Sequence, residues 1–141
     1  MTRLIKIFVI EEHDDVRQAL VVRLCAAPGV LIVGEAQATE TALEEISALR
    51  PDVVLIETKR ADGRGLEMVN CIARGSSGAK VIALTSYPNE WERWAVRRAG
   101  AVGYFLKEIG STSQLLEHIR NVVILNSPEL KAGAARQTVR G

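Results

Sequence analysis

The sequence predicts one α/β domain built on a doubly wound parallel sheet, and three observations indicate this. Short apolar runs alternate along the chain with segments whose apolar residues recur at helical spacing. The run at 53–56 has no polar alternation, which is typical of a strand covered on both faces. The chain has 141 residues, 48% of them hydrophobic, enough for one sizeable core. Strict alternation with short connections requires right-handed crossovers and helices on both faces of the sheet.

The first half of the chain predicts three strand and helix pairs. The strands are expected over 5–10, over 31–33 at the sheet edge, and up to Glu57. Asp14 or Asp15 caps the first helix, Thr39 or Thr41 starts the second, and the third follows a polar loop over 58–65. The side chains expected to face inward from these helices are Val16, Ala19, Leu20, Leu24, Ala42, Ile46, Leu49, Leu66, Val69 and Ile72.

Two further pairs follow in the second half. A strand over 80–84 leads to Thr85, and Asn89 and Glu92 are spaced as the cap and third residue of a helix that ends near Gly100. The last strand, over 102–106, leads to a helix with Ser111 and Gln114 at capping-box spacing. The inward stripe expected on that last helix is Leu115, Ile119 and Val122.

Five such pairs fit a flavodoxin-like (βα)5 sheet with strand order 2-1-3-4-5, whose switch point lies between the first and third strands. Ligands of such sheets bind outside the carboxyl ends of the strands. The polar groups that follow those ends here are Glu11, Glu12, Glu57, Thr85 and Lys107. The sequence therefore predicts an acidic site with one hydroxyl and one lysine at a single sheet edge.

Charge and composition exclude several classes of protein. A formal net charge of +1 does not point to nucleic acid or to an anionic membrane. Lys6 interrupts the first apolar run and two acids follow it, so we expect a cytoplasmic protein with no membrane span. Cys25 and Cys71 fall within predicted helices and are expected to be buried, reduced thiols. We assign residues 1–125 to the domain and 126–141 to a tail or linker, because the apolar pattern stops there.

With these elements placed, the chain resembles the receiver (CheY-like) domain of bacterial two-component response regulators, and most closely the NarL/FixJ (LuxR-type) family. The similarity runs from about Ile5 to Val123. It rests on ordered motifs, which are Val9-Ile10-Glu11-Glu12-His13, Val33-Gly34-Glu35-Ala36, Pro51-Asp52-Val53-Val54-Leu55, Ala83-Leu84-Thr85-Ser86 and Ala99-Gly100-Ala101-Val102-Gly103-Tyr104-Phe105-Leu106-Lys107.

The resemblance implies a non-enzymatic role in phosphorelay signalling, with a sensor histidine kinase or another signalling protein as the partner. It implies that the pair Glu11 and Glu12, with Glu57, binds Mg²⁺, and that Glu57 stands at the phosphoacceptor position. The residues that correspond to the phosphoryl contacts and the switch aromatic are Thr85, Lys107 and Tyr104. A receiver of this type usually precedes a helix-turn-helix domain, so any DNA contact would belong to a domain beyond this chain.

The sequence departs from the family in having glutamates where aspartates are usual, and Ala61 where the following loop usually has proline. The added methylene moves a carboxylate by roughly 1.3 Å, and a misplacement of about 1 Å can cost on the order of a hundredfold in in-line attack. Three interpretations of Glu57 stay open. It caps the strand and pairs with Lys107, it imitates a phosphorylated aspartate, which we favour, or it accepts a phosphoryl group as usual.

The acidic site needs charge compensation, because carboxylates 4 Å apart repel by about 4 kcal/mol per pair at an effective dielectric near 20. Lys107, a shared proton or Mg²⁺ would each provide it. Trp91 and Trp94 are three residues apart on one predicted helix, and both cannot easily point inward. An exposed indole there would mark a partner surface, with a homodimer as one candidate.

A different class of function is a small phosphotransferase or hydrolase built from the acids and Lys107. No glycine-rich phosphate loop, nucleophile elbow or dinucleotide fingerprint follows any predicted strand. The sequence therefore favours a signalling receiver that acts through protein contacts to control an output such as transcription.

Overall fold

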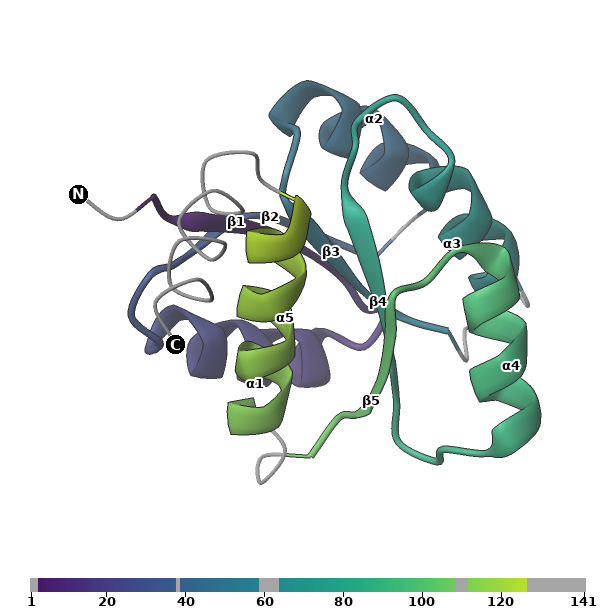
Figure 1. Cartoon of the computed structure of the whole chain (residues 1–141). Helices are drawn as coiled ribbons and strands as arrows, with labels where there is room; N and C mark the ends of the chain where they lie inside the picture. Colours follow the sequence, from purple (N-terminus) through teal and green to yellow (C-terminus); the bar gives the residue numbers. More distant parts are fainter. Residues whose placement is uncertain (1–2, 38, 59–63, 109–111, 127–141) are drawn as a thin grey trace, which may run out of the picture.

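The computed structural model describes residues 3–37, 39–58, 64–108 and 112–126. Five parallel strands form one sheet in the order β2-β1-β3-β4-β5, and a helix follows each strand (Figure 1). The elements are β1 (Ile5–Ile10), α1 (Asp14–Cys25), β2 (Val30–Ala36), α2 (Thr39–Leu49), β3 (Val53–Glu57), α3 (Gly65–Ala73), β4 (Lys80–Thr85), α4 (Glu90–Ala99), β5 (Gly103–Leu106) and α5 (Thr112–Asn126). This topology confirms the predicted flavodoxin-like fold.

The core has two layers, one on each face of the sheet. Successive strand residues point to opposite faces, so Val54 and Ile56 pack against α2, α3 and α4, whereas Val53 and Leu55 pack against α1 and α5. Figure 1 shows the corresponding grouping of the helices on the two sides. All five residues of β3 are buried, as the absence of polar alternation in this strand predicted.

The ends of α4 follow the predicted capping residues. The side chain of Asn89 accepts a 2.8 Å hydrogen bond from the backbone N–H of Glu92, which satisfies one free donor of the first turn. Gly100 ends the helix with a φ of 118°, a left-handed conformation that glycine adopts without a Cβ penalty. The helix therefore has fixed ends beside the carboxyl edge of the sheet.

The inward face predicted for α1 was right for Leu20 and Leu24 and wrong for Val16 and Ala19. Val16 and Ala19 are exposed, and the buried residues are Arg17, Leu20 and Leu24. The prediction counted only apolar residues, whereas Arg17 is buried because acidic side chains and a carbonyl pair with its guanidinium. The pattern of apolar residues alone therefore misses the charged member of this buried face.

Two smaller expectations were also wrong. Leu49 is exposed because it is the last residue of α2, where the helix leaves the sheet. Cys25 and Cys71 are free thiols, as expected, but both are exposed. The predicted loop over 58–65 is described only at Thr58, Arg64 and Gly65, and Ser111 and the tail after Asn126 lie outside the described residues. In the described ranges no helix combines the length and apolar character needed to cross a bilayer.

Candidate functional site

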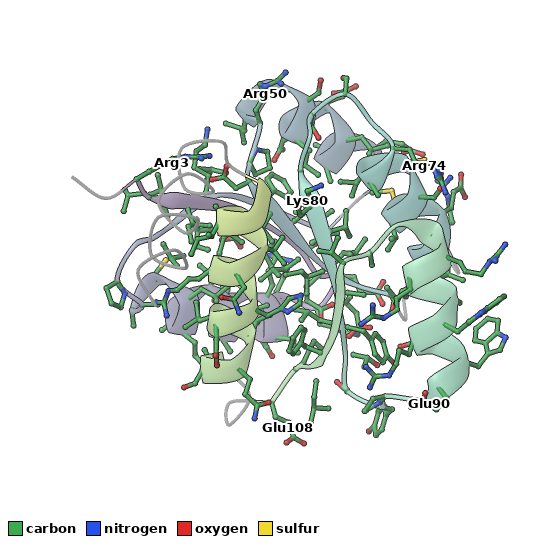
Figure 2. All side chains as sticks on the ribbon, in the orientation of Figure 1. Arg3, Arg50, Arg74, Lys80, Glu90 and Glu108 are labelled. Atoms are coloured by element: carbon green, nitrogen blue, oxygen red, sulfur yellow. The ribbon has the colours of Figure 1, made fainter. Side chains whose placement is uncertain are left out.

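The strand register places the predicted acids at the same level on neighbouring strands. In the β1 and β3 pair, Ile10 lies beside Ile56, so Glu11 and Glu57 follow together where the two strands leave the core. Figure 2 shows Glu90 and Glu108 at this carboxyl edge, and Arg3 and Lys80 towards the opposite one. The switch point predicted from the sequence is therefore where the two acids meet.

Lys107 lies between the two acids. Its Nζ is 2.5 Å from Glu11 Oε1 and 2.5 Å from Glu57 Oε2. Glu11 is 2% exposed and Glu57 is 4% exposed, so neither charge is solvated by bulk water. The backbone helps to fix the lysine, because the N–H of Lys107 donates to the carbonyl of Thr85 at 2.9 Å. Two carboxylates and one ammonium group thus form a compact, buried ion cluster.

The pKa values of this cluster reflect the competition between burial and pairing. Burial works to raise the pKa of Glu11, but hydrogen bonds from Lys107 and from the backbone of His13 leave it below its ordinary value. Burial works to lower the pKa of Lys107, but hydrogen bonds to Glu11 and then Glu57 leave it above its ordinary value. Pairing therefore favours the charged forms of Glu11 and Lys107.

The arrangement does not fit a divalent metal well. Among the described residues, no group of three or more acidic, histidine or cysteine side chains is placed to hold an ion. A Mg²⁺ ion needs oxygen ligands at about 2.0–2.1 Å in octahedral geometry, whereas the ammonium group of Lys107 lies directly against an oxygen of both Glu11 and Glu57. The lysine supplies the positive charge that a cation would otherwise bring.

His13 follows the acidic pair and contacts it. Its backbone N–H donates to Glu11 Oε2 at 3.2 Å, and its Nδ1 lies 3.5 Å from the same oxygen. Glu12, the second acid of the predicted pair, is half-buried beside Glu11. Glu11 itself is turned towards the lysine and is held there from two sides.

Arg17 is a site residue that the sequence reasoning missed. From α1, its Nη1 donates to the carbonyl of Glu11 at 2.9 Å, its Nε to Glu35 at 2.9 Å, and its Nη2 to Asp14 at 2.7 Å. The hydrogen bond to Glu35 works to raise the pKa of Arg17 above its ordinary value. Asp14 three residues before Arg17 was the available signal. Arg17 positions Glu11 by holding its backbone.

Thr85 ends β4 and Tyr104 lies in β5, and both contact the residues just before α4. Thr85 is fully buried, and its Oγ1 accepts a 3.1 Å hydrogen bond from the backbone N–H of Tyr87. The hydroxyl of Tyr104 accepts from the backbone N–H of Asn89 at 3.2 Å and donates to Glu92 Oε1 at 2.6 Å. Burial, followed by the bond to Glu92, raises the pKa of Tyr104. Both side chains therefore hold the segment that connects β4 to α4.

Glu92 has a different partner from the one its spacing predicted. In a capping box the carboxylate at this position returns to the N–H of the cap residue. Here Glu92 is buried and accepts from the Tyr104 hydroxyl, while that hydroxyl accepts the N–H of Asn89. The Tyr104 hydroxyl thus lies between the N–H of Asn89 and the carboxylate of Glu92, and it connects β5 to the first turn of α4.

Both tryptophans of α4 are exposed, Trp91 to 68% and Trp94 to 59%. Arg98 lies over the ring of Trp94, with its Cζ 5.1 Å from the centroid. The prediction that the two indoles cannot both point inward is confirmed, since neither does.

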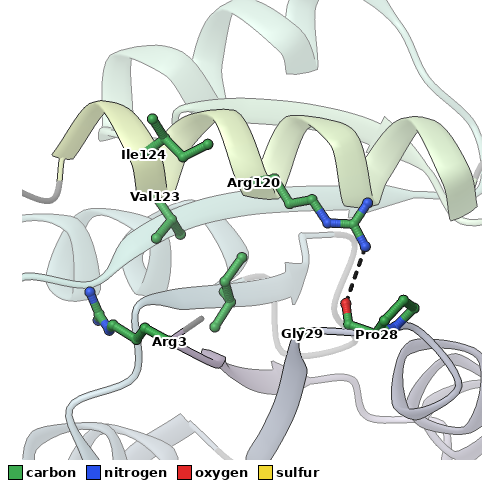
Figure 3. Close-up of a pocket in the computed structure, with 7 residues that line it drawn as sticks. Arg3, Pro28, Gly29, Arg120, Val123 and Ile124 are labelled. Atoms are coloured by element: carbon green, nitrogen blue, oxygen red, sulfur yellow. Dashed lines mark hydrogen bonds between the residues drawn. The ribbon is translucent and has the colours of Figure 1, made fainter. Parts of the chain in front are cut away.

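A pocket of about 370 Å³ lies at the start of β1, whereas Glu11 follows the other end of that strand. Figure 3 shows the residues that line the pocket. Its lining is mainly apolar and comes from the start of β1, the turn at Gly29 and the last turns of α5. Arg120 closes one side by donating to the carbonyl of Pro28 at 3.3 Å. No predicted site residue lines this pocket.

Known proteins resemble the chain over most of its length. The model of the response regulator receiver domain family matches residues 7–120. The DNA-binding transcriptional activator DevR/DosR of Mycobacterium tuberculosis is 33% identical over 106 residues, which are 75% of this chain and 49% of that protein. Response regulator GacA of Pseudomonas syringae is 33% identical over 119 residues, 84% of this chain and 55% of that protein. The chain thus spans about half the length of the curated relatives it matches.

Solved structures agree on the fold. A LuxR-family two-component response regulator from Aurantimonas sp. SI85-9A1 superposes with a TM-score of 0.78 at 22% identity, covering 96% of this chain and 99% of that one. The response regulator domain of Thermotoga maritima CheB gives a TM-score of 0.77 at 24% identity, covering 86% and 97%. The family match and the curated relatives show that the chain belongs to the response regulator receiver domain family of two-component signalling.

Proposed function

We propose that this receiver domain signals without phosphorylation, and that its own carboxylates hold the conformation that a phosphoryl group would otherwise stabilise. The observation that carries the proposal is the position of Lys107 between Glu11 and Glu57, at 2.5 Å from each. Two carboxylates and one ammonium leave one net negative charge in the cluster. That charge is supplied by side chains and needs no phosphodonor.

Geometry works against phosphoryl transfer to Glu57. The acceptor oxygen, a metal ion and the incoming phosphorus must align, and a displacement of about 1 Å can reduce such a rate on the order of a hundredfold. In this site Lys107 is already bound to both acids, and no metal ligand cluster occurs in the described part of the chain. A static charge has no such alignment requirement, because it needs only to stay close to Lys107.

The proposed output passes through α4. Thr85 and Tyr104 contact the segment before α4 and its first turn, so their positions set where that helix begins. Trp91 and Trp94 on the outer side of the same helix are the proposed contact residues for a signalling partner, including a second copy of this domain. The domain itself performs no catalysis in this proposal, and it works in the cytoplasm with a sensor histidine kinase or another signalling protein.

We propose in addition that residues 126–141 are a linker to an output domain. The support is that the relatives are about twice as long as the matched region and that one is described as a DNA-binding transcriptional activator. DNA binding would then belong to the output domain alone. Reading the gene beyond the codon for Gly141 tests this, since a stop codon there would contradict it.

The central test is chemical. Wild-type protein and a Glu57→Asp variant are incubated with acetyl phosphate and Mg²⁺, and an added phosphoryl group is sought by intact and peptide mass spectrometry. We expect none at wild-type Glu57, because the longer side chain misplaces the acceptor oxygen. The aspartate variant shows whether shortening that side chain restores transfer. An acyl phosphate on wild-type Glu57 would contradict the proposal.

A further inference from the structure

The pocket at the start of β1 has the size and the lining of a small-molecule site. Its volume of about 370 Å³ lies in the range of roughly 300–1,000 Å³ that is typical of ligand pockets. Its walls are mainly apolar and include Ile5 of β1 and Val123 and Ile124 of α5. Ligand pockets combine such an interior with a few polar groups that orient the ligand. The polar groups here are the guanidinium groups of Arg3 and Arg120.

The backbone fixes the wall that the turn after α1 provides. The N–H of Ile5 donates to the carbonyl of Gly29 at 2.8 Å, which holds this turn against the start of β1. Gly29 has a φ of 82°, a left-handed conformation that glycine adopts without a Cβ penalty. A Cβ at Gly29 would meet no atom within 4 Å, so the space beside the turn is open. The pocket is therefore formed before a ligand arrives.

Arg3 and Arg120 lie on opposite sides of the pocket (Figure 3), and only Arg3 has its charge compensated. Arg3 forms an ion pair with Asp52, whose second oxygen accepts the backbone N–H of Lys6 at 2.8 Å. Arg120 donates to the neutral carbonyl of Pro28 at 3.3 Å, and within the described ranges it has no acidic partner. Hydrogen bonds from a guanidinium to an anion are shorter, at about 2.7–2.9 Å. Arg120 is therefore the group at this pocket that can receive an anion.

We propose that the pocket binds a small organic acid with an aliphatic body, whose carboxylate pairs with Arg120. A guanidinium presents its N–H groups in a planar fork that matches the two oxygens of a carboxylate. The aliphatic body covers Ile5, Val123 and Ile124 and removes apolar surface from water. A neutral apolar ligand would leave the charge of Arg120 unmatched, and an inorganic anion would leave the apolar walls uncovered. An aliphatic acid satisfies both parts of the pocket at once.

This site goes beyond the proposed function, because it shares no residue with the ion cluster. Lys107 and Glu57 do not line the pocket, and Glu11 follows the opposite end of β1. The ligand would contact β1, the turn after α1 and the last turns of α5 together. A ligand that binds the folded chain and not the unfolded chain stabilises the fold by mass action. Binding should therefore raise the Tm of the domain.

Titration of the whole chain with octanoate, followed by NMR, locates the site. The amide signals of Ile5, Gly29 and Val123 are expected to shift and to saturate, while that of the distant Trp91 stays unchanged. Hexanoate and decanoate extend the series, and each two added methylenes are expected to tighten binding by roughly tenfold. The absence of saturable shifts at the three pocket residues, or equal affinity for all three acids, would overturn the proposal.

Two further probes test the nature of the ligand. 1-Octanol has the same aliphatic body without the charge, and inorganic phosphate has charge without an aliphatic body. Both are expected to bind at least tenfold more weakly than octanoate. If octanol binds as tightly, the pocket takes neutral ligands, and if phosphate binds as tightly, it is a plain anion site. Either result would overturn the proposal.

Substitution of Arg120 tests its role directly. Arg120→Gln removes the charge at an exposed position, so the fold is expected to be retained. Its affinity for octanoate should fall by roughly tenfold or more, while its affinity for octanol should not change. Arg97→Gln, at an exposed position of α4, is the matched control and should bind octanoate as wild type does. Unchanged affinity of Arg120→Gln for octanoate would overturn the assignment. None of these measurements bears on phosphorylation of Glu57, so the two proposals fail separately.

Discussion

The hydroxyl of Tyr104 donates a 2.6 Å hydrogen bond to the buried carboxylate of Glu92, and this bond connects the last strand to the first turn of α4. A charged acceptor makes such a bond stronger than one between neutral groups. The same hydroxyl accepts the N–H of Asn89. Because Tyr104 is 6% exposed, water cannot easily replace it in either role. Tyr104 is thus held inward by groups of α4 and its cap.

Tyr104→Phe should therefore lower the free energy of unfolding by about 1 to 3 kcal/mol, since it removes a donor from a buried carboxylate and an acceptor from a buried N–H. Urea denaturation measures this. Tyr87→Phe is the matched control, because Tyr87 is exposed and the same change there should have a much smaller effect. Equal effects of the two substitutions would mean that the contact with Glu92 adds little stability.

Lys107→Ala should destabilise the fold by about 3 to 5 kcal/mol, because it leaves two buried carboxylates without their shared cation. Thermal and urea unfolding at neutral pH provide the measurement, with Lys80→Ala as the control, since Lys80 is only half-buried and lies at the other end of a strand. If Mg²⁺ restores stability to the alanine variant, a cation has taken the place of Lys107. Stability equal to that of wild type without any divalent cation would contradict the ion cluster.

The same cluster predicts a pH dependence. The pKa of Glu11 lies below its ordinary value of 4.5, so its contribution is present above pH 4.5 and is lost as the pH falls through the lowered value. The pKa of Lys107 lies above its ordinary value of 10.5, so its contribution is complete below pH 10.5 and is lost as the pH rises through the raised value. The stability difference between wild type and Lys107→Met should be largest near neutral pH. It should shrink in acid, where the buried carboxylates become protonated, and in base, where Lys107 loses its proton. A difference that does not vary with pH would contradict the assignment.

The spacing of apolar residues and the polar residues that follow the strands were sufficient to predict the strand order and most residues of the candidate site. Glu11, Glu57, Thr85 and Lys107 meet at one edge because carboxyl ends of parallel strands always do. The role of Arg17 was not predictable in this way, since its burial depends on partners from β1, β2 and its own helix, Glu35 among them. The bond between Glu92 and Tyr104 was not predictable either, because the capping-box spacing pointed to the N–H of Asn89 as the partner of Glu92.

The measurement that tests the account most directly compares wild type with Glu57→Gln by NMR in the absence of any phosphodonor. Glutamine keeps nearly the same size and removes the charge. We predict that the signals of Thr85, Tyr104 and the α4 backbone shift in this variant, because Lys107 loses one of its two carboxylates. Glu44→Gln on the surface of α2 should leave them unchanged. If Glu57→Gln gives the wild-type signals at Thr85, Tyr104 and α4, the charge does not set the switch, and Glu57 merely ends its strand.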